Sequence, residues 1–159
     1  MKIIKISLLS LLGIVSFFLL GFYAYYEINR LQNIAHLGEP ASRLKQAGYS
    51  FRDLNKNGRL DPYEDARLSP QQRTEDLLAQ MNLAEKAGTM YITQIAVGAD
   101  GELVDRPNPG DLFSFAAPPN SELIAAKQMN HFNVVFIHTA QALATWQNKV
   151  QAMAERSRL

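Results

Sequence analysis

An uncharged and mostly apolar run lies near the start of the sequence, from Ile6 to Tyr26 (ISLLSLLGIVSFFLLGFYAYY). A helix needs about 20 such residues to cross the hydrocarbon core of a bilayer. Lys2 and Lys5 precede the run, and aromatic residues gather at its far end. Basic residues on the cytoplasmic side and tyrosines at the opposite interface are typical of a membrane-spanning helix. The pattern predicts a transmembrane signal anchor over residues 1–26, with a single pass through the cell membrane.

A cleaved secretory signal is the alternative interpretation of this run. Signal cleavage requires small residues at the first and third positions before the cut. A cut after Ala24 would place Phe22 at the third position, and a cut after Gly21 would place Leu19 there. Both sites are poor, so the uncleaved anchor is favoured. Either interpretation predicts that the rest of the chain is exported to the periplasm or the extracellular medium, with residues 27–47 as a juxtamembrane linker.

Helix-capping signals recur further along the chain. Pro40 and Gly48 bound the stretch PASRLKQAG, which is expected to form a short helix. Ser69-Pro70 before QQRTEDLLAQM, and Asn82 before LAEKAGTM, each have Gln or Glu three residues after the cap, which is the capping-box pattern. Another helix, ELIAAKQMN, is expected after a cap at Asn120 or Ser121. The helix that follows Ser69 has its apolar face at Leu77, Leu78 and Met81.

A continuous apolar run, FNVVFIH from Phe132 to His138, predicts a strand that is buried on both faces, as in a parallel sheet. Apolar residues then recur at helical spacing: Leu143, Trp146, Val150 and Met153. A helix, a buried strand and another helix in succession are typical of an α/β protein.

The sequence offers no second convincing strand of this kind. Residues 92–105, ITQIAVGADGELVD, instead suggest a hairpin around Asp100-Gly101. An unpaired apolar strand is an aggregation hazard. The chain is therefore expected to be the opening piece of a larger barrel or sheet.

The overall composition excludes some classes of function. The chain has 159 residues, enough for one domain, and its formal net charge is +1. It has no basic stripe interleaved with aromatic residues, so nucleic-acid binding is not expected. It also has no cysteine, which excludes disulfides, thiol nucleophiles and cysteine metal sites.

The stretch FRDLNKNGRLDPYED, residues 51–65, spaces oxygen-bearing side chains as calcium loops do. Such loops have ligands at positions 1, 3, 5, 9 and 12, Gly at position 6 and a backbone carbonyl at position 7. Counting from the first aspartate, every position matches: Asp53, Asn55, Asn57, Gly58, Arg59 (through its carbonyl), Asp61 and Glu64. The sequence therefore predicts a structural Ca²⁺ site.

A turn followed by a capped helix explains part of the same stretch. Asn57-Gly58 favours a turn, and Asp61-Pro62-Tyr63-Glu64 has the form of a capping box with Pro at the first helical position. These local reasons do not account for Asp53 and Asn55. The preceding residues, YSFRD, are expected to be extended, so the loop would be a lone structural site and not part of a two-helix hand.

These segments, taken together, resemble the start of glycoside hydrolase family 3, the β-glucosidase group. FRDLNKNGRLDPYEDARLSPQQRTEDLLAQMNLAEKAGTM is similar to its acidic loop and the patterns LL..M and L.EK.G.M. MNHFNVVFI followed by TWQNKVQAMAERSRL is similar to the family's first barrel strand and the next helix. The resemblance covers residues 48–159. It implies the N-terminal portion of a (β/α)₈-type, TIM-like barrel that is incomplete in this chain.

The resemblance also implies retaining hydrolysis of β-linked glucosides or oligosaccharides, which needs two carboxyl groups about 5 Å apart. The family's nucleophile is an Asp far along the barrel, and its acid/base lies beyond. No catalytic residue is expected within these 159 residues, so the chain is expected to be inactive by itself. A different class stays open, namely a small membrane-anchored calcium-binding module of the cell envelope.

Two aromatic side chains are candidates for sugar contact. His138 ends the predicted strand, and in a barrel that end faces the active site, so it could bind substrate or be structural. Trp146, spaced with Leu143 and Val150, is expected to pack against the sheet and not to serve as a sugar platform. The loop over residues 98–119 would either cover the barrel mouth or lie in solvent.

Overall fold

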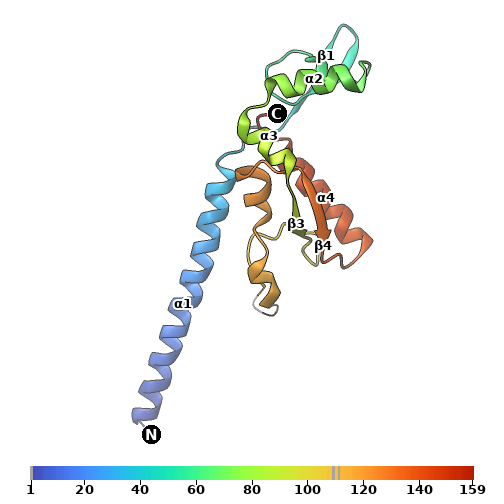
Figure 1. The fold of residues 1–159 in the computed structure, drawn as a ribbon. Coiled ribbons are helices and arrows are strands. Elements are labelled where there is room, and N and C mark those ends of the chain that lie inside the picture. The colour runs from blue at the N-terminus through green and yellow to red at the C-terminus, as the bar shows by residue number, and fades with distance from the viewer. Residues whose placement is uncertain (1, 109, 111) are drawn as a thin grey trace.

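The computed structural model describes residues 2–108, 110 and 112–159. Met1, Pro109 and Asp111 lie outside this description, as do the parts of the predicted anchor (1–26) and loop (98–119) that fall on them. A long helix, α1 (Lys2–Ile34), projects from a body of short helices and strands (Figure 1).

Helix α1 confirms the predicted N-terminal helix and continues beyond the apolar run to Ile34. Its segment Leu9–Ile34 is long and apolar enough to cross a membrane; the most apolar 18-residue window of this segment has a mean hydropathy of 1.8 and is not buried against the body. A signal sequence would show the same length and composition. The helix is therefore established, and its place in a membrane stays a proposal.

The helix expected over residues 40–48 is a wrong prediction. The chain forms an antiparallel hairpin there, with β1 (Ser42–Gln46) paired to β2 (Tyr49–Asp53). Ala47 and Gly48 connect the strands with φ values of 48° and 83°. Two consecutive positive φ angles match the twist of paired strands, so Gly48 is a hairpin turn residue and not a helix cap. The extended conformation predicted for YSFRD is confirmed.

Both capping-box helices are confirmed. Helix α2 (Pro70–Gln80) follows Ser69, whose hydroxyl accepts a hydrogen bond from the Gln72 amide, and α3 (Leu83–Met90) follows Asn82 in the same way. The apolar face predicted for α2 is not buried, since Leu78 is 46% exposed.

Strand β3 (Ile92–Ala96) pairs in parallel with β4 (His131–Val135), with Ile92 opposite His131 and Ala96 opposite Val135. The prediction that the chain lacks a partner strand is therefore wrong. The hairpin signal at Asp100-Gly101 produces only a turn with one antiparallel bridge, between Val97 and Leu103. That local signal concealed the long-range pairing.

Strand β4 is also more exposed than predicted. It ends at Val135, and Phe136 takes a φ of 60°, which breaks the extended conformation before His138. Phe136 and Ile137 are about half exposed, so the expectation of burial on both faces is wrong for the described residues. Helix α4 (Ala140–Ala154) follows and gives the predicted strand–helix succession. The complete barrel stays a prediction.

Three short helical turns complete the body: η1 (Pro62–Glu64), η2 (Leu112–Ala116) and η3 (Glu122–Ala126). The element η3 is a five-residue π-helix in place of the longer helix predicted after residue 120. The side chain of Ser121 makes no capping bond there, and the Asn120 side chain bonds elsewhere.

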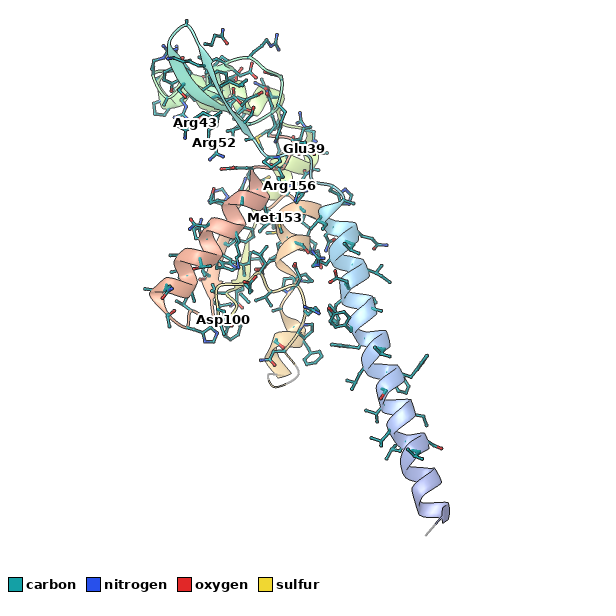
Figure 2. The ribbon with its side chains drawn as sticks, turned by 180° about the vertical axis from the view of Figure 1, so that it is seen from behind. Glu39, Arg43, Arg52, Asp100, Met153 and Arg156 are labelled. Carbon is teal, nitrogen blue, oxygen red and sulfur yellow. The ribbon has the colours of Figure 1, made fainter. Side chains whose placement is uncertain are left out.

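The core gathers around Trp146 of α4, which is 1% exposed and packs with Ile95, Val97, Leu123, Ile124 and Val150. The indole Nε1 donates to Asn120 Oδ1 at 2.9 Å. The predicted packing role of Trp146 is confirmed. The linker after α1 is held to the segment after α4, where Arg156 lies (Figure 2). The Gly38 amide donates to the Arg156 carbonyl at 2.8 Å, and Arg156 Nε donates to the Gly38 carbonyl at 2.9 Å.

Candidate functional site

The predicted calcium loop lies between the end of β2 and the end of η1. Its first and last predicted ligands, Asp53 and Glu64, are both buried. Asp53 is the last residue of β2, and Glu64 is the last residue of η1. Two short elements therefore hold the ends of the loop and bring these two carboxylates to it.

Asp53 organises the turn through both of its carboxylate oxygens. Oδ1 accepts a hydrogen bond from the Asn57 amide at 3.0 Å, and Oδ2 accepts one from the Gly58 amide at 2.9 Å. Gly58 has a φ of 76°, a conformation that a glycine adopts without strain. Asp53 and Gly58 thus both stabilise the same turn.

Glu64 joins the two arms of the loop. Its Oε1 accepts from the Leu54 amide at 2.6 Å, and its Oε2 accepts from the Asp61 amide at 3.2 Å. The second bond belongs to the capping arrangement that the sequence suggested. The first bond crosses the loop, so Glu64 does more than cap a helical turn.

The two asparagines point their amide nitrogens at Asp61. Asn55 Nδ2 and Asn57 Nδ2 lie 2.5 and 2.6 Å from Asp61 Oδ2. Their oxygens accept instead from backbone amides, at Asn57 and Arg59. Two N–H donors thus converge on the carboxylate where a cation would bind. A bound Ca²⁺ would require both amides to turn their oxygens inward.

The loop therefore has the oxygen-bearing side chains that Ca²⁺ binds, but these side chains are not oriented as they are in a calcium site. The predicted ligands Asp53, Asn55, Asn57, Asp61 and Glu64 lie in one loop, and hard oxygen donors are what Ca²⁺ binds. Across the described residues, no group of three or more His, Cys, Asp or Glu side chains is arranged to hold a metal ion. The amide of Arg59 belongs to the turn. The Ca²⁺ site stays a proposal.

Tyr63 is a member of this site that the sequence pattern did not identify. Its side chain is buried, and its hydroxyl makes no hydrogen bond of ordinary geometry within the described residues, although Glu64 is adjacent. Burial raises the pKa of Tyr63, and the charges of Glu64, Asp61 and Asp53 raise it further. The Tyr63 hydroxyl is thus under the electrostatic influence of these three carboxylates. The sequence feature that could have identified Tyr63 is its position between Asp61 and Glu64 in the stretch DPYE.

Lys56 supplies positive charge at the edge of the loop. Burial lowers the pKa of Lys56, and attraction to Asp53, Glu155 and Glu64 offsets part of that effect. Its Nζ also donates to the carbonyl of Ser157. The ammonium group therefore stabilises the acidic loop and fastens it to the segment after α4.

The second predicted site residue, His138, lies beyond the carboxyl ends of β3 and β4. It is exposed and lines a cavity of about 200 Å³ together with Ala96, Val97, Phe136 and Arg106. The structure thus places His138 at the edge where ligands of parallel sheets bind. A substrate contact by His138 stays a prediction.

Comparison with known proteins gives three similar sequences. The chain is 35% identical over 113 residues to a periplasmic β-glucosidase/β-xylosidase of Dickeya chrysanthemi. It is 34% identical over 113 residues to a probable β-glucosidase C of Aspergillus oryzae. Each match covers 70% of this chain. A probable β-glucosidase C of Aspergillus flavus is 35% identical over 98 residues, or 61% of the chain. The chain is β-glucosidase-like in sequence.

No family model matches the chain. The predicted resemblance to β-glucosidases is nevertheless confirmed by the three relatives. This β-glucosidase-like chain spans 16% of the length of the Dickeya protein and 14% of that of the A. flavus protein. The activity and substrates of a whole β-glucosidase therefore remain proposals for this chain.

Proposed function

We propose that the chain is a membrane-anchored, exported part of a β-glucosidase-like glycoside hydrolase that acts on β-linked glucosides or oligosaccharides with retention. The observation that carries the proposal is the similarity over 113 residues to a protein named as a periplasmic β-glucosidase/β-xylosidase. Helix α1, with its apolar segment Leu9–Ile34, supports the anchor. A secreted form after signal cleavage is the alternative for the leader.

The sheet supports a role as the start of a barrel. Parallel sheets are normally covered on both faces. Here β3 and β4 leave Ile92 75% exposed, and Phe136 and Ile137 follow the pair with half-exposed side chains. Helix α4 succeeds β4 as in a repeated strand–helix unit. We propose that further strands and helices of a (β/α)₈-type barrel cover these surfaces in the enzyme.

The carboxylates of this chain favour structural roles over catalysis. Asp53 and Glu64 accept backbone hydrogen bonds in the loop, Glu85 pairs with Arg158, and Asp65 pairs with Arg67. Retaining hydrolysis needs a nucleophile and an acid/base about 5 Å apart. We propose that both are supplied outside these residues, so that the chain alone does not release the chromophore of an aryl β-glucoside; turnover by the purified chain would overturn this part.

A chimera tests the proposed function. The 113-residue segment of the Dickeya enzyme that matches this chain is replaced by the corresponding residues of this chain. We expect the chimera to fold and to hydrolyse an aryl β-glucoside, because the segment supplies the same part of the fold. A matched chimera carrying Gly88→Ala should be less thermally stable, which would show that the grafted segment packs as it does here. A folded chimera with no hydrolysis would reject the proposed role.

A second candidate function is that of a calcium-binding module of the cell envelope. The buried Tyr63 hydroxyl favours it, because this group has no hydrogen-bond partner of ordinary geometry in the described part of the chain and feels the charges of Asp53, Asp61 and Glu64. In either function Ca²⁺ would be a structural ion held by the loop, with oxygens of Asp53, Asn55, Asn57, Arg59 (carbonyl), Asp61 and Glu64. The titration given in the Discussion tests it.

A further inference from the structure

One face of α1 packs against the body near the end of its apolar run. The half-buried positions recur at helical spacing: Phe22, Tyr26, Asn29, Arg30 and Asn33. The partner is the segment between β3 and β4, and α1 contacts η3 directly. Asn33 Nδ2 donates to Ser121 Oγ at 3.3 Å. Figure 1 shows this segment reaching along α1 toward the N-terminal end of the helix.

Two contacts extend this packing into the apolar part of α1. The rings of Phe22 and Phe115 lie 5.9 Å apart between centroids. The guanidinium of Arg106 lies 4.5 Å from the centroid of the Tyr23 ring. Phe115 is nevertheless 46% exposed. An apolar side chain of the body is thus placed beside the anchor and left uncovered.

An open apolar hollow of about 670 Å³ joins Phe115 to α1. Phe115 lines it together with Val15, Phe17, Phe18, Leu19 and Phe22. Phe17 and Phe18 are also strongly exposed. The exposed surface of Phe115 is therefore continuous with the apolar surface that the proposed anchor would present to lipid.

The position of Phe22 along α1 sets the depth of this contact. At about 1.5 Å per residue, the run from Ile6 to Tyr26 spans about 30 Å, which matches the hydrocarbon core of a bilayer. Phe22 then lies about 6 Å inside the outer boundary of that core. Tyr23 lies about 4.5 Å inside the same boundary. Arg106, whose guanidinium lies over the Tyr23 ring, can extend from there to the interface, where arginine and tyrosine side chains place their polar ends.

We propose that the Phe115 segment (residues 114–117) is a second membrane-contact element, which inserts into the outer leaflet beside α1. Phe115 enters the acyl-chain region, and Arg106 reaches the headgroup level. The partner is the lipid surface itself. The inference rests on the proposed anchoring by α1, and it adds that the exported body touches the bilayer and does not hang from a free linker.

Single-cysteine labelling tests this contact, because the chain has no cysteine of its own. The full chain is reconstituted in phosphatidylcholine/phosphatidylglycerol vesicles with a fluorophore on Phe115→Cys. Leu78→Cys is the matched control, since Leu78 in α2 has the same exposed fraction of 46%. Leu19→Cys reports on α1. Quenching by a nitroxide on the lipid acyl chain is measured for each.

We expect strong quenching and a blue-shifted emission at positions 19 and 115, and weak quenching at position 78. Quenching at 19 together with weak quenching at 115 would overturn this inference and leave the anchor standing. Weak quenching at position 19 would reject both the proposed membrane anchoring by α1 and this inference. Ala116→Cys, at an exposed small residue, repeats the test without disturbing the Phe22–Phe115 contact.

Discussion

Gly88 of α3 lies directly against the backbone of Gln128, so that a Cβ at position 88 would stand only 2.2 Å from the Gln128 carbonyl oxygen. This close contact packs α3 against the segment that leads into β4. Gln128 itself has a φ of 54°, a conformation that brings its backbone round to meet the helix. Glycine at position 88 is therefore required by contact and not by helix propensity.

We predict that Gly88→Ala destabilises the body by about 1–3 kcal/mol, because two backbone segments must separate to admit the methyl group. Alanine is the better helix former, so propensity alone predicts the opposite sign. Thermal unfolding followed by the fluorescence of Trp146, the single tryptophan, measures the change. Gly38→Ala is the matched control, since its nearest neighbour lies at an ordinary 3.7 Å. Equal stability of the two variants would contradict the packing argument.

We predict that Asn120→Ala destabilises the core by about 1–3 kcal/mol. Asn120 Oδ1 accepts from Trp146 Nε1 at 2.9 Å and from the Val104 amide at 3.0 Å. Removal of the Asn120 amide leaves the Trp146 Nε1 and Val104 N donors without this buried acceptor. Denaturant unfolding measures the change, with Asn130→Ala as the control at an exposed asparagine. A loss no greater than that of the control would show that water replaces the amide oxygen at little cost.

We predict that Ca²⁺ at about 10 mM raises the free energy of unfolding by about 1–3 kcal/mol, as expected for a site with the weak affinity of extracellular modules. Asp53→Ala and Glu64→Ala should each abolish this gain. Both variants also lose backbone hydrogen bonds, so the decisive quantity is the change on adding Ca²⁺ and not the stability of the variant. Glu39→Ala, at an exposed carboxylate of the linker, should keep the gain. An unchanged melting temperature of the natural chain would reject the site.

We predict an acid-dependent loss of stability that originates at Asp65. Hydrogen bonds from Arg67, at 2.8 Å from Nε and 2.6 Å from Nη2, lower the pKa of Asp65 to about 2 from the ordinary 3.8. A lowered pKa stabilises the fold above pH 3.8 and ceases to do so as the pH falls toward 2. Melting temperatures measured across this range should fall less steeply for Asp65→Asn. An unchanged slope would show that Arg67 does not stabilise the folded carboxylate.

The sequence predicted best those elements of the fold that depend on residues close together in the chain. The capping boxes at Ser69 and Asn82 join residues three apart, so their pattern is complete in the sequence. The turn at Ala47 was missed because alanine rarely takes a positive φ, and it does so here with Gly48 beside it. The pairing of β3 with β4 joins distant segments, and a nearby turn signal at Asp100-Gly101 concealed it.

At the candidate site, too, the sequence predicted local features and missed those that depend on the rest of the structure. The spacing from Asp53 to Glu64 indicated that these carboxylates belong to one loop, and both accept backbone hydrogen bonds within it. Their binding of Ca²⁺ stays a prediction. The spacing could not predict that Asn55 and Asn57 would turn their nitrogens toward Asp61, since that depends on backbone donors placed by the turn. The burial of Tyr63 depends on packing against the rest of the body, which no spacing rule records.

The direction of β3 and β4 bears on how the cavity at His138 could be reached. Both strands run toward the end of the molecule where the N-terminus of α1 lies (Figure 1). The cavity at His138 also has Arg106 in its wall, the residue that lies over Tyr23 of α1. If α1 is embedded as proposed, this rim of the sheet would face the lipid headgroups and not the medium. A molecule that enters this cavity would then have to approach along the membrane surface, between the sheet and the headgroups.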